Sequence, residues 1–319
     1  MGRTGRRNWW AVAAAFGSAC GDIREDEDTT APTTTVATTT ASTSDPSGET
    51  DPSDTTDAPE STGGMTKLDV GFDTAATEAD VDGIDDCTQD VDIVFVMDVS
   101  TSMGPILATL ADEILVVDEA IAALGLPNAP HYGLVVFVDD AAILNMGAPY
   151  GDVSTLRADF MQWSAFTSSN QQVNGGNQNS TWPENSLDAL FLAGAGFQWR
   201  PAGDDTLRMI IHTTDDTFWD GPTMGNGLPI AHGYDEVVDT LQQGSIRTFT
   251  FSSQIGGSCE CEDVTPGWST PYQGKPTIPE ATDGSVFDLD LVLAGQLSLS
   301  AAIGGAIDDT MCEPYTPVG

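Results

Sequence analysis

The chain has 319 residues, enough for one or two domains, and a formal net charge of −39 from 10 Lys and Arg against 49 Asp and Glu. This balance excludes nucleic acid as a partner, because phosphate binding requires a basic surface. An anionic membrane surface is excluded for the same reason. The acidity is compatible with a protein that holds divalent cations or works in salty surroundings.

The first twenty residues predict an export signal. Three arginines precede an apolar stretch at residues 9–16, which is too short to span a bilayer. Residues 17–20 are similar to a bacterial lipoprotein cleavage box with Cys20 as the lipidated residue, although Gly17 stands where Leu is usual. Residues 6–10 are also similar to a twin-arginine signal.

The alternative to lipidation is simple cleavage before Cys20, which would leave a free thiol. We expect an exported protein of the cell envelope or outer surface, lipid-anchored or otherwise secreted.

Residues 21–85 are rich in Thr, Ser, Pro and acidic side chains. Such a segment buries too little apolar surface to offset its ordering entropy, so we predict a disordered stalk and linker. Its Asp-rich stretch at residues 80–86 departs from EF-hand spacing and is interpreted as solvated linker. A folded domain is predicted at residues 86–315.

The folded part opens with a continuous apolar run at residues 93–97, which predicts a central parallel strand buried on both faces. Apolar residues then recur every three or four positions from 103 to 124, a pattern typical of one helix face. Residues 132–138 and 141–146 predict two strands joined by a tight turn, so that the second strand is antiparallel to the first.

The rest of the chain continues the alternation of helices and strands. Further helices are predicted at residues 154–163, 183–197, 234–243 and 291–307, and further strands at 207–211, 246–251 and 286–287. Residues 170–181 are a polar loop, and residues 253–279 an irregular insertion rich in Pro and Gly. The alternation predicts an α/β fold with a doubly wound, mostly parallel sheet and helices on both faces. Ligands bind such sheets at the carboxyl ends of the strands.

The first predicted strand ends in a D-x-S-x-S pattern formed by Asp98, Ser100 and Ser102. A hard cation such as Mg²⁺ prefers six oxygen ligands in an octahedron. Two hydroxyls at alternate positions of a turn can point to one centre, and Asp98 adds negative charge directly or through a water. The helix that follows begins close by, so its dipole would attract an anion that docks on the ion.

Residues 91–103 resemble the opening of a von Willebrand factor A (VWA) domain, in which D-x-S-x-S is the first part of a metal ion-dependent adhesion site. The resemblance covers roughly residues 90–310. It implies the Rossmann-like VWA fold, a binding function and no enzymatic activity. It also implies two further groups of ligands from two other strand ends.

The second group of ligands has two candidates. Many VWA domains use a Thr after a Gly-rich sequence, for which Thr181 is the candidate. Integrin β subunits use a Glu in a context similar to residues 183–189, which makes Glu184 the favoured ligand. The alternatives are that Thr181 is a helix N-cap and that Glu184 complements the helix dipole. The third group is Asp215, in the T-D step after a strand, with Asp216 as a neighbour or turn residue.

The resemblance also implies how the site works. The ion, expected to be Mg²⁺ with Mn²⁺ or Ca²⁺ as alternatives, keeps one position for the Asp or Glu carboxylate of a protein partner. Trp182 and Trp219 flank the site and are candidate contact anchors, with packing at the sheet edge as the alternative. For Phe218 the packing role is favoured. Paired aspartates for a second, neighbouring metal site are absent from residues 104–110.

The cysteines suggest an oxidising compartment. They are Cys20, Cys87, Cys259, Cys261 and Cys312. Cys87 and Cys312 flank the predicted domain, and because domain ends often lie close together, we predict a disulfide between them. The pair at 259 and 261 would form a short ring or bind something outside. A zinc site that adds His212 or His232 does not match the usual ligand spacing, and His212 is interpreted as a packed strand residue.

The sequence argues against one alternative function and leaves another open. Phosphatase-like hydrolases of the haloacid dehalogenase type need a second Asp where this chain has Ser100, and a Lys near the phosphate. The chain has only Lys67 and Lys275, neither after a strand end, and it has no G-x-S-x-G elbow or Walker loop. The other alternative is a VWA scaffold without a functional metal site, which only the metal dependence of binding would distinguish.

Overall fold

The computed structural model describes residues 89–202, 206–254 and 263–319. The predicted export signal, the stalk and linker, and the cysteines at 20, 87, 259 and 261 lie outside the described residues. The domain boundaries at residues 86 and 315 stay a prediction.

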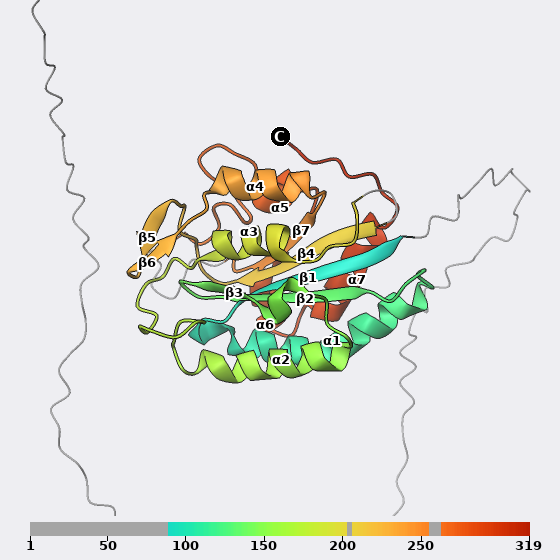
Figure 1. The fold of residues 1–319 in the computed structure, drawn as a ribbon, viewed down its shortest axis with the longest axis horizontal. Coiled ribbons are helices and arrows are strands. Elements are labelled where there is room, and N and C mark those ends of the chain that lie inside the picture. Colours follow the sequence, from blue (N-terminus) through green and yellow to red (C-terminus); the bar gives the residue numbers. More distant parts are fainter. Residues whose placement is uncertain (1–88, 203–205, 255–262) are drawn as a thin grey trace, which may run out of the picture. The chain divides into compact units, whose positions relative to one another are not determined.

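A six-stranded sheet forms the centre of the described chain (Figure 1). Its strands are β1 (Asp90–Asp98), β2 (His131–Phe137), β3 (Ala141–Ile143), β4 (Thr206–Thr214), β7 (Arg247–Ser252) and β8 (Val286–Asp288). The order across the sheet is β3-β2-β1-β4-β7-β8. Every neighbouring pair is parallel except β2 with β3, which is antiparallel. The predicted mostly parallel sheet is confirmed, as is the predicted antiparallel pairing of the second hairpin strand, which the structure places at the edge of the sheet.

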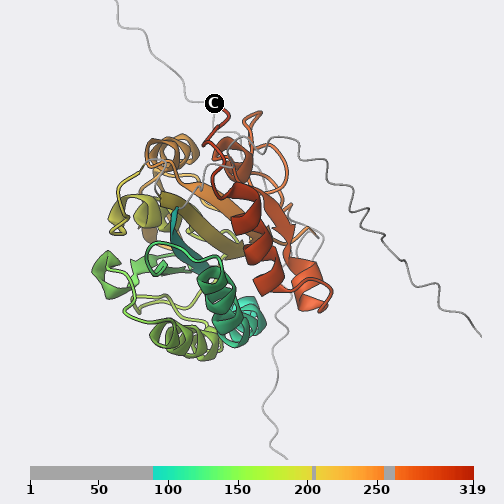
Figure 2. The same cartoon turned by 90° about the vertical axis from the view of Figure 1, so that its right-hand side faces the viewer.

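Helices cover both faces of the sheet, as Figures 1 and 2 show from two directions. One face carries α1 (Gly104–Ala123), α2 (Val153–Thr167), α6 (Leu289–Leu293) and α7 (Leu299–Thr310). The other carries α3 (Ser186–Gly196), α4 (Tyr234–Gln243) and α5 (Ile278–Ala281). The predicted doubly wound α/β fold is therefore confirmed. Among the described residues, none of the helices combines the length and apolar character that a membrane span requires.

The apolar run of β1 is explained by these two layers. Ile93, Phe95 and Met97 pack into the core shared with α1 and α7, while Val94 and Val96 pack into the core shared with α3 and α4. All five side chains are fully buried. Because successive strand residues point to opposite faces, a strand covered on both sides needs an apolar residue at every position.

The predicted strand at residues 141–146 is too long. β3 ends at Ile143, and the chain continues as a short 3-10 turn, η2 (Leu144–Gly147). Asn145 and Met146 adopt left-handed backbone conformations, with φ of 52° and 54°, which an extended strand cannot contain.

Two predicted helices also differ from the structure. The predicted helix at residues 291–307 is two helices, α6 and α7, separated by a turn in which Gly295 has a φ of 65°. The helix predicted to begin at residue 183 begins at Ser186, because Asn185 is its N-cap and its side chain accepts a hydrogen bond from the backbone N–H of Asp188.

A small hairpin was not predicted. It consists of β5 (Thr223–Gly225) and β6 (Leu228–Ile230), which pair antiparallel near the N-terminal end of α3 (Figure 1). Asn226 and Gly227 form its two-residue loop, both with positive φ, at 47° and 79°. Asn-Gly is the sequence signature of such a turn, so the signal was present in the sequence. α5 is a second unpredicted element, at the end of the segment predicted to be irregular.

Candidate metal centre

The candidate centre is built where β1 and β4 end side by side at the carboxyl edge of the sheet. Asp98, the last residue of β1, is fully buried. Its Oδ1 accepts the backbone N–H of Ser100 at 2.8 Å, and its Oδ2 accepts the hydroxyl of Thr214 at 2.8 Å. Parallel neighbouring strands thus place the first predicted motif beside the T-D step that follows β4.

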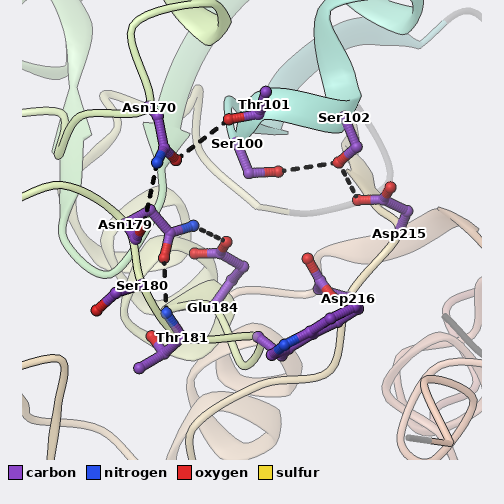
Figure 3. A pocket seen from close by; sticks show the side chains of 11 residues that line it. Ser100, Thr101, Ser102, Asn170, Asn179, Ser180, Thr181, Glu184, Asp215 and Asp216 are labelled. Carbon is purple, nitrogen blue, oxygen red and sulfur yellow. Dashed lines mark hydrogen bonds between the residues drawn. The ribbon is translucent and has the colours of Figure 1, made fainter. Parts of the chain in front are cut away.

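The two serines of the first motif meet the residue predicted from the second strand (Figure 3). The Oγ of Ser102 donates to Oδ1 of Asp215 at 2.9 Å, and it lies 3.3 Å from the Oγ of Ser100. Ser100 is buried, with 6% of its surface exposed, while Ser102 is exposed. Four residues predicted to be ligands, from two separate parts of the chain, therefore lie together.

A third carboxylate, Asp216, joins this cluster and was not predicted as a ligand. One oxygen from each of Asp98, Asp215 and Asp216 can be chosen so that all three lie within 4.8 Å of one another. The backbone N–H of Asp216 donates to the hydroxyl of Thr214 at 3.2 Å, which fixes the start of the turn. The sequence signal was the consecutive pair of aspartates after the strand, but sequence does not tell whether both side chains face one centre.

Glu184 reaches the same pocket from the segment before α3. Its backbone N–H donates to the carbonyl of Thr217 at 2.9 Å, and its own carbonyl accepts the N–H of Trp219 at 3.1 Å, so the loop after β4 holds it in place. The side chain is fully buried. Oε1 accepts the amide of Asn179 at 2.7 Å, whereas Oε2 has no hydrogen-bond partner among the described residues.

Thr181, the other candidate for the second group, makes a different contact. Its hydroxyl donates to Oδ1 of Asp139 at 2.8 Å. The alternative role of Thr181 as the N-cap of the following helix is wrong, because Asn185 occupies that position. Asp139 is itself fully buried and also accepts amide hydrogens from Gln172 and Asn226.

These side chains surround a pocket of about 460 Å³ (Figure 3). It is lined by Ser100, Thr101, Ser102, Asn170, Asn179, Ser180, Thr181, Trp182, Glu184, Asp215 and Asp216. Trp182 is 45% exposed there, so an apolar surface lies beside the carboxylates.

The other two aromatic residues near the site pack within the protein. Trp219 lies against the β5–β6 hairpin, where a Cβ at Gly225 would be only 2.6 Å from the indole Nε1. Phe218 is 7% exposed, and its ring contacts those of Trp268 and Tyr234 at centroid distances of 5.1 and 5.8 Å. The packing role favoured for Phe218 agrees with these contacts.

The carboxylates of the centre repel one another in a partly desolvated place. Burial, and then the charge of Asp215, raise the pKa of Asp98 to about 7. Burial raises the pKa of Glu184 well above its usual range, and the charges of Asp98 and Asp139 add to this effect. Burial also raises the pKa of Asp215, although the Ser102 hydroxyl opposes the shift. A bound cation would remove the cause of these shifts, because it favours the charged form of every neighbouring carboxylate.

The donor set fits a hard divalent cation. Three carboxylates converge at the strand ends, two hydroxyls lie beside them, and the buried Oε2 of Glu184 has no partner among the described residues. Buried polar atoms are nearly always paired, so an orphaned carboxylate oxygen beside a polar pocket is where a cation fits.

The two histidines considered for zinc have other surroundings. His212 is fully buried in β4, stacked on Phe137 and tilted against Trp268, and burial lowers the pKa of its imidazole to about 3. The interpretation of His212 as a packed strand residue agrees with this position. Nδ1 of His232 lies 2.8 Å from Oδ1 of Asp188.

Cys312 is disulfide-bonded. Its backbone N–H donates to the side-chain oxygen of Gln89 at 2.8 Å, so the two ends of the described domain lie side by side. Because Cys87 lies outside the described residues, the Cys87–Cys312 pairing stays a prediction, which this proximity favours.

Two solved structures show a distant likeness to this chain. No family model matches the chain, and no curated protein matches it. One of the two structures is that of an aerotolerance-related membrane protein from Bacteroides fragilis NCTC 9343 with multiple mutations to serines. Its sequence is 16% identical to this chain, the TM-score is 0.39, and the match covers 69% of this chain and 100% of that protein's chain. Proximal thread matrix protein 1 from the mussel byssus is 16% identical with a TM-score of 0.38 and covers 69% of this chain and 47% of that one. At these values neither likeness bears on function.

Proposed function

We propose that this protein is an exported binding module that holds a divalent cation at the ends of β1 and β4 and uses it to bind the carboxylate of a protein partner. The first ligands are Asp98, Ser100, Ser102 and Asp215, with Glu184 as the ligand from the segment before α3. The proposal of a non-enzymatic role rests on the ligand set and on the resemblance of the first motif. Export rests on the N-terminal sequence pattern alone.

One observation carries the proposal. The buried Oε2 of Glu184 has no partner among the described residues, and its side chain lines the same pocket as Asp215 and Asp216. Leaving a carboxylate oxygen buried and unpaired costs roughly 1–3 kcal/mol or more. A cation in the pocket would pair this oxygen and offset the repulsion among the carboxylates. Thr181 stays the alternative ligand, because it lines the same pocket, but its hydroxyl oxygen already has a partner in Asp139, whereas Oε2 of Glu184 has none among the described residues.

The partner would enter through the open side of the pocket. An acidic protein can attract an acidic group only where a bound ion reverses the local field, so the ion supplies both the attraction and the direction of binding. Trp182 offers a half-exposed aromatic surface at the pocket, which suits a contact anchor beside the carboxylate. Trp219 is less suited, since it packs against the hairpin.

The test is a titration of divalent cations into the full-length protein after chelator treatment, followed by its thermal midpoint. Binding to the folded state alone raises the midpoint saturably, by about 2.7 kcal/mol of stability at a hundredfold excess over Kd. We expect this rise in the wild type and its loss in Asp98→Ala and Ser100→Ala. Ser154→Ala is the matched control, because Ser154 is an exposed serine on α2 outside the pocket.

The second step measures partner binding with a peptide that carries one Asp or Glu. Binding that requires the cation and disappears in Ser100→Ala supports the full proposal. If the midpoint of the wild type does not respond to any divalent cation, the metal site is absent and the domain is better explained as a scaffold. If the cation binds but no acidic peptide does, the carboxylate partner is wrong while the metal site stands.

A further inference from the structure

Asp216 changes the number of oxygen ligands that the protein can offer to one ion. The resemblance that led to the other ligands left Asp216 as a neighbour or turn residue. In the structure its carboxylate belongs to the same cluster as Asp98 and Asp215 and lines the same pocket. We propose that Asp216 is a direct ligand and that it makes the centre selective for Ca²⁺ over Mg²⁺. This inference rests on the proposed metal site.

The carboxylates are close enough to share one ion. The three aspartate oxygens lie within 4.8 Å of one another, so one divalent cation could contact all three. Asp98 is held at this place by the hydrogen bonds that it accepts from Ser100 and Thr214.

The number of ligands points to Ca²⁺. The three clustered aspartates and the hydroxyls of Ser100 and Ser102 offer five protein oxygens, and Oε2 of Glu184, whose side chain lines the same pocket outside that cluster, would offer a sixth. Six oxygens complete the octahedron of Mg²⁺ and would leave no position for a partner. Ca²⁺ accepts six to eight oxygens in flexible geometry, so it retains one or two positions for a partner's carboxylate.

The chemistry of the donors agrees with the count. Mg²⁺ dehydrates reluctantly and is usually held through only one or two carboxylates, with several waters kept. A centre that presents four carboxylates, three of them clustered and one buried with an unpaired oxygen, replaces most of the water around an ion. Ca²⁺ tolerates that replacement better. The expectation of Mg²⁺ from the first motif alone therefore changes once Asp216 is included.

The experiment compares Ca²⁺ and Mg²⁺ binding calorimetrically in the full-length protein after removal of metal by a chelator. We expect Ca²⁺ to bind the wild type at least about tenfold more tightly than Mg²⁺. Asp216→Asn preserves the shape of the side chain but weakens its oxygen as a ligand. It should lower the Ca²⁺ affinity by about tenfold or more, with a smaller loss for Mg²⁺, so that the ratio of the two affinities falls. The thermal midpoint in chelator verifies that the variant folds.

Asp239→Asn is the matched control, since Asp239 is exposed on α4 and the substitution removes the same charge from the protein. It should leave the ratio of Ca²⁺ to Mg²⁺ affinity unchanged. Equal affinities in the wild type, or an unchanged ratio in Asp216→Asn, would overturn the inference while the metal site survives. If neither ion binds the wild type, the proposed function itself is wrong.

Discussion

Asp98 illustrates how one residue at this centre is held in an unfavourable state. It is fully buried and accepts hydrogen bonds from Ser100 and Thr214, both of which favour the charged carboxylate. Burial and the nearby charge of Asp215 outweigh them, and the pKa rises from 3.8 to about 7. Without a cation, this carboxyl therefore destabilises the fold whenever it is ionised, which is a common compromise at binding sites.

This shift predicts how stability depends on pH in the absence of metal. Because the pKa of Asp98 is higher in the folded than in the unfolded state, the folded state binds more protons between pH 3.8 and about 7. The stabilising effect of protonated Asp98 is fully present below pH 3.8 and is lost as pH rises through about 7. The measurement is the free energy of unfolding in urea at several pH values, with chelator present.

Asp98→Asn is the comparison, since it keeps the size of the side chain and cannot titrate. The other acidic groups also titrate over this range, so the informative quantity is the difference between wild type and variant. The wild type should lose more stability with rising pH than the variant does, and a saturating divalent cation should reduce that loss. Parallel pH profiles in chelator would contradict the assignment to Asp98.

At the scale of elements, the wall of the pocket depends on the β5–β6 hairpin. Asn226, at the tip of the hairpin, donates to Oδ2 of Asp139 at 2.8 Å and to the carbonyl of Gln178 at 3.0 Å. Its Oδ1 accepts the hydroxyl of Ser180 at 2.9 Å. The hairpin thus connects to the polar loop that carries Ser180 and Thr181, both of which line the pocket.

We therefore predict that Asn226→Gly destabilises the protein by about 1–3 kcal/mol, because a buried carboxylate loses one of its partners. Glycine adopts the positive φ of this position without strain, so the change isolates the side-chain contacts. Residues 171–183 should also exchange their amide hydrogens faster. Urea unfolding and hydrogen exchange measure the two effects. Met224→Ala is the control on the same hairpin, where a 59% exposed side chain should matter by less than about 0.5 kcal/mol.

The elements also explain what the sequence could predict. The apolar run of β1 and the D-x-S-x-S motif were informative because burial on both faces and a strand end impose strict local patterns. The break between α6 and α7 was missed because helical periodicity continues across Gly295. The place of Asp216 in the carboxylate cluster was not predicted, since the sequence does not show that the turn after β4 brings two consecutive carboxylates to one centre.

At the scale of the whole molecule, the charge of −39 opposes the compact state through general repulsion. Attractive pairs at the surface do little to balance it. Exposed ion pairs among the described residues, such as Lys275 with Asp235 and Arg157 with Asp112, each contribute about 0–1 kcal/mol. Screening therefore removes more repulsion than attraction, and monovalent salt should stabilise this protein.

We predict that raising NaCl from about 0.05 M to about 1 M, which shortens the Debye length from roughly 14 Å to 3 Å, increases the thermal midpoint in chelator without saturating. Each kcal/mol of repulsion removed corresponds to about 2–4 °C for a domain of this size.

A divalent cation should act differently from NaCl, since it fills one site and its effect saturates at low concentration. Asp98→Asn separates the two effects: it should keep the response to NaCl and lose the saturable response to the divalent cation. A midpoint that falls with NaCl would mean that surface ion pairs outweigh the net charge. A variant that keeps the saturable response would mean that the cation stabilises the protein somewhere other than the ends of β1 and β4.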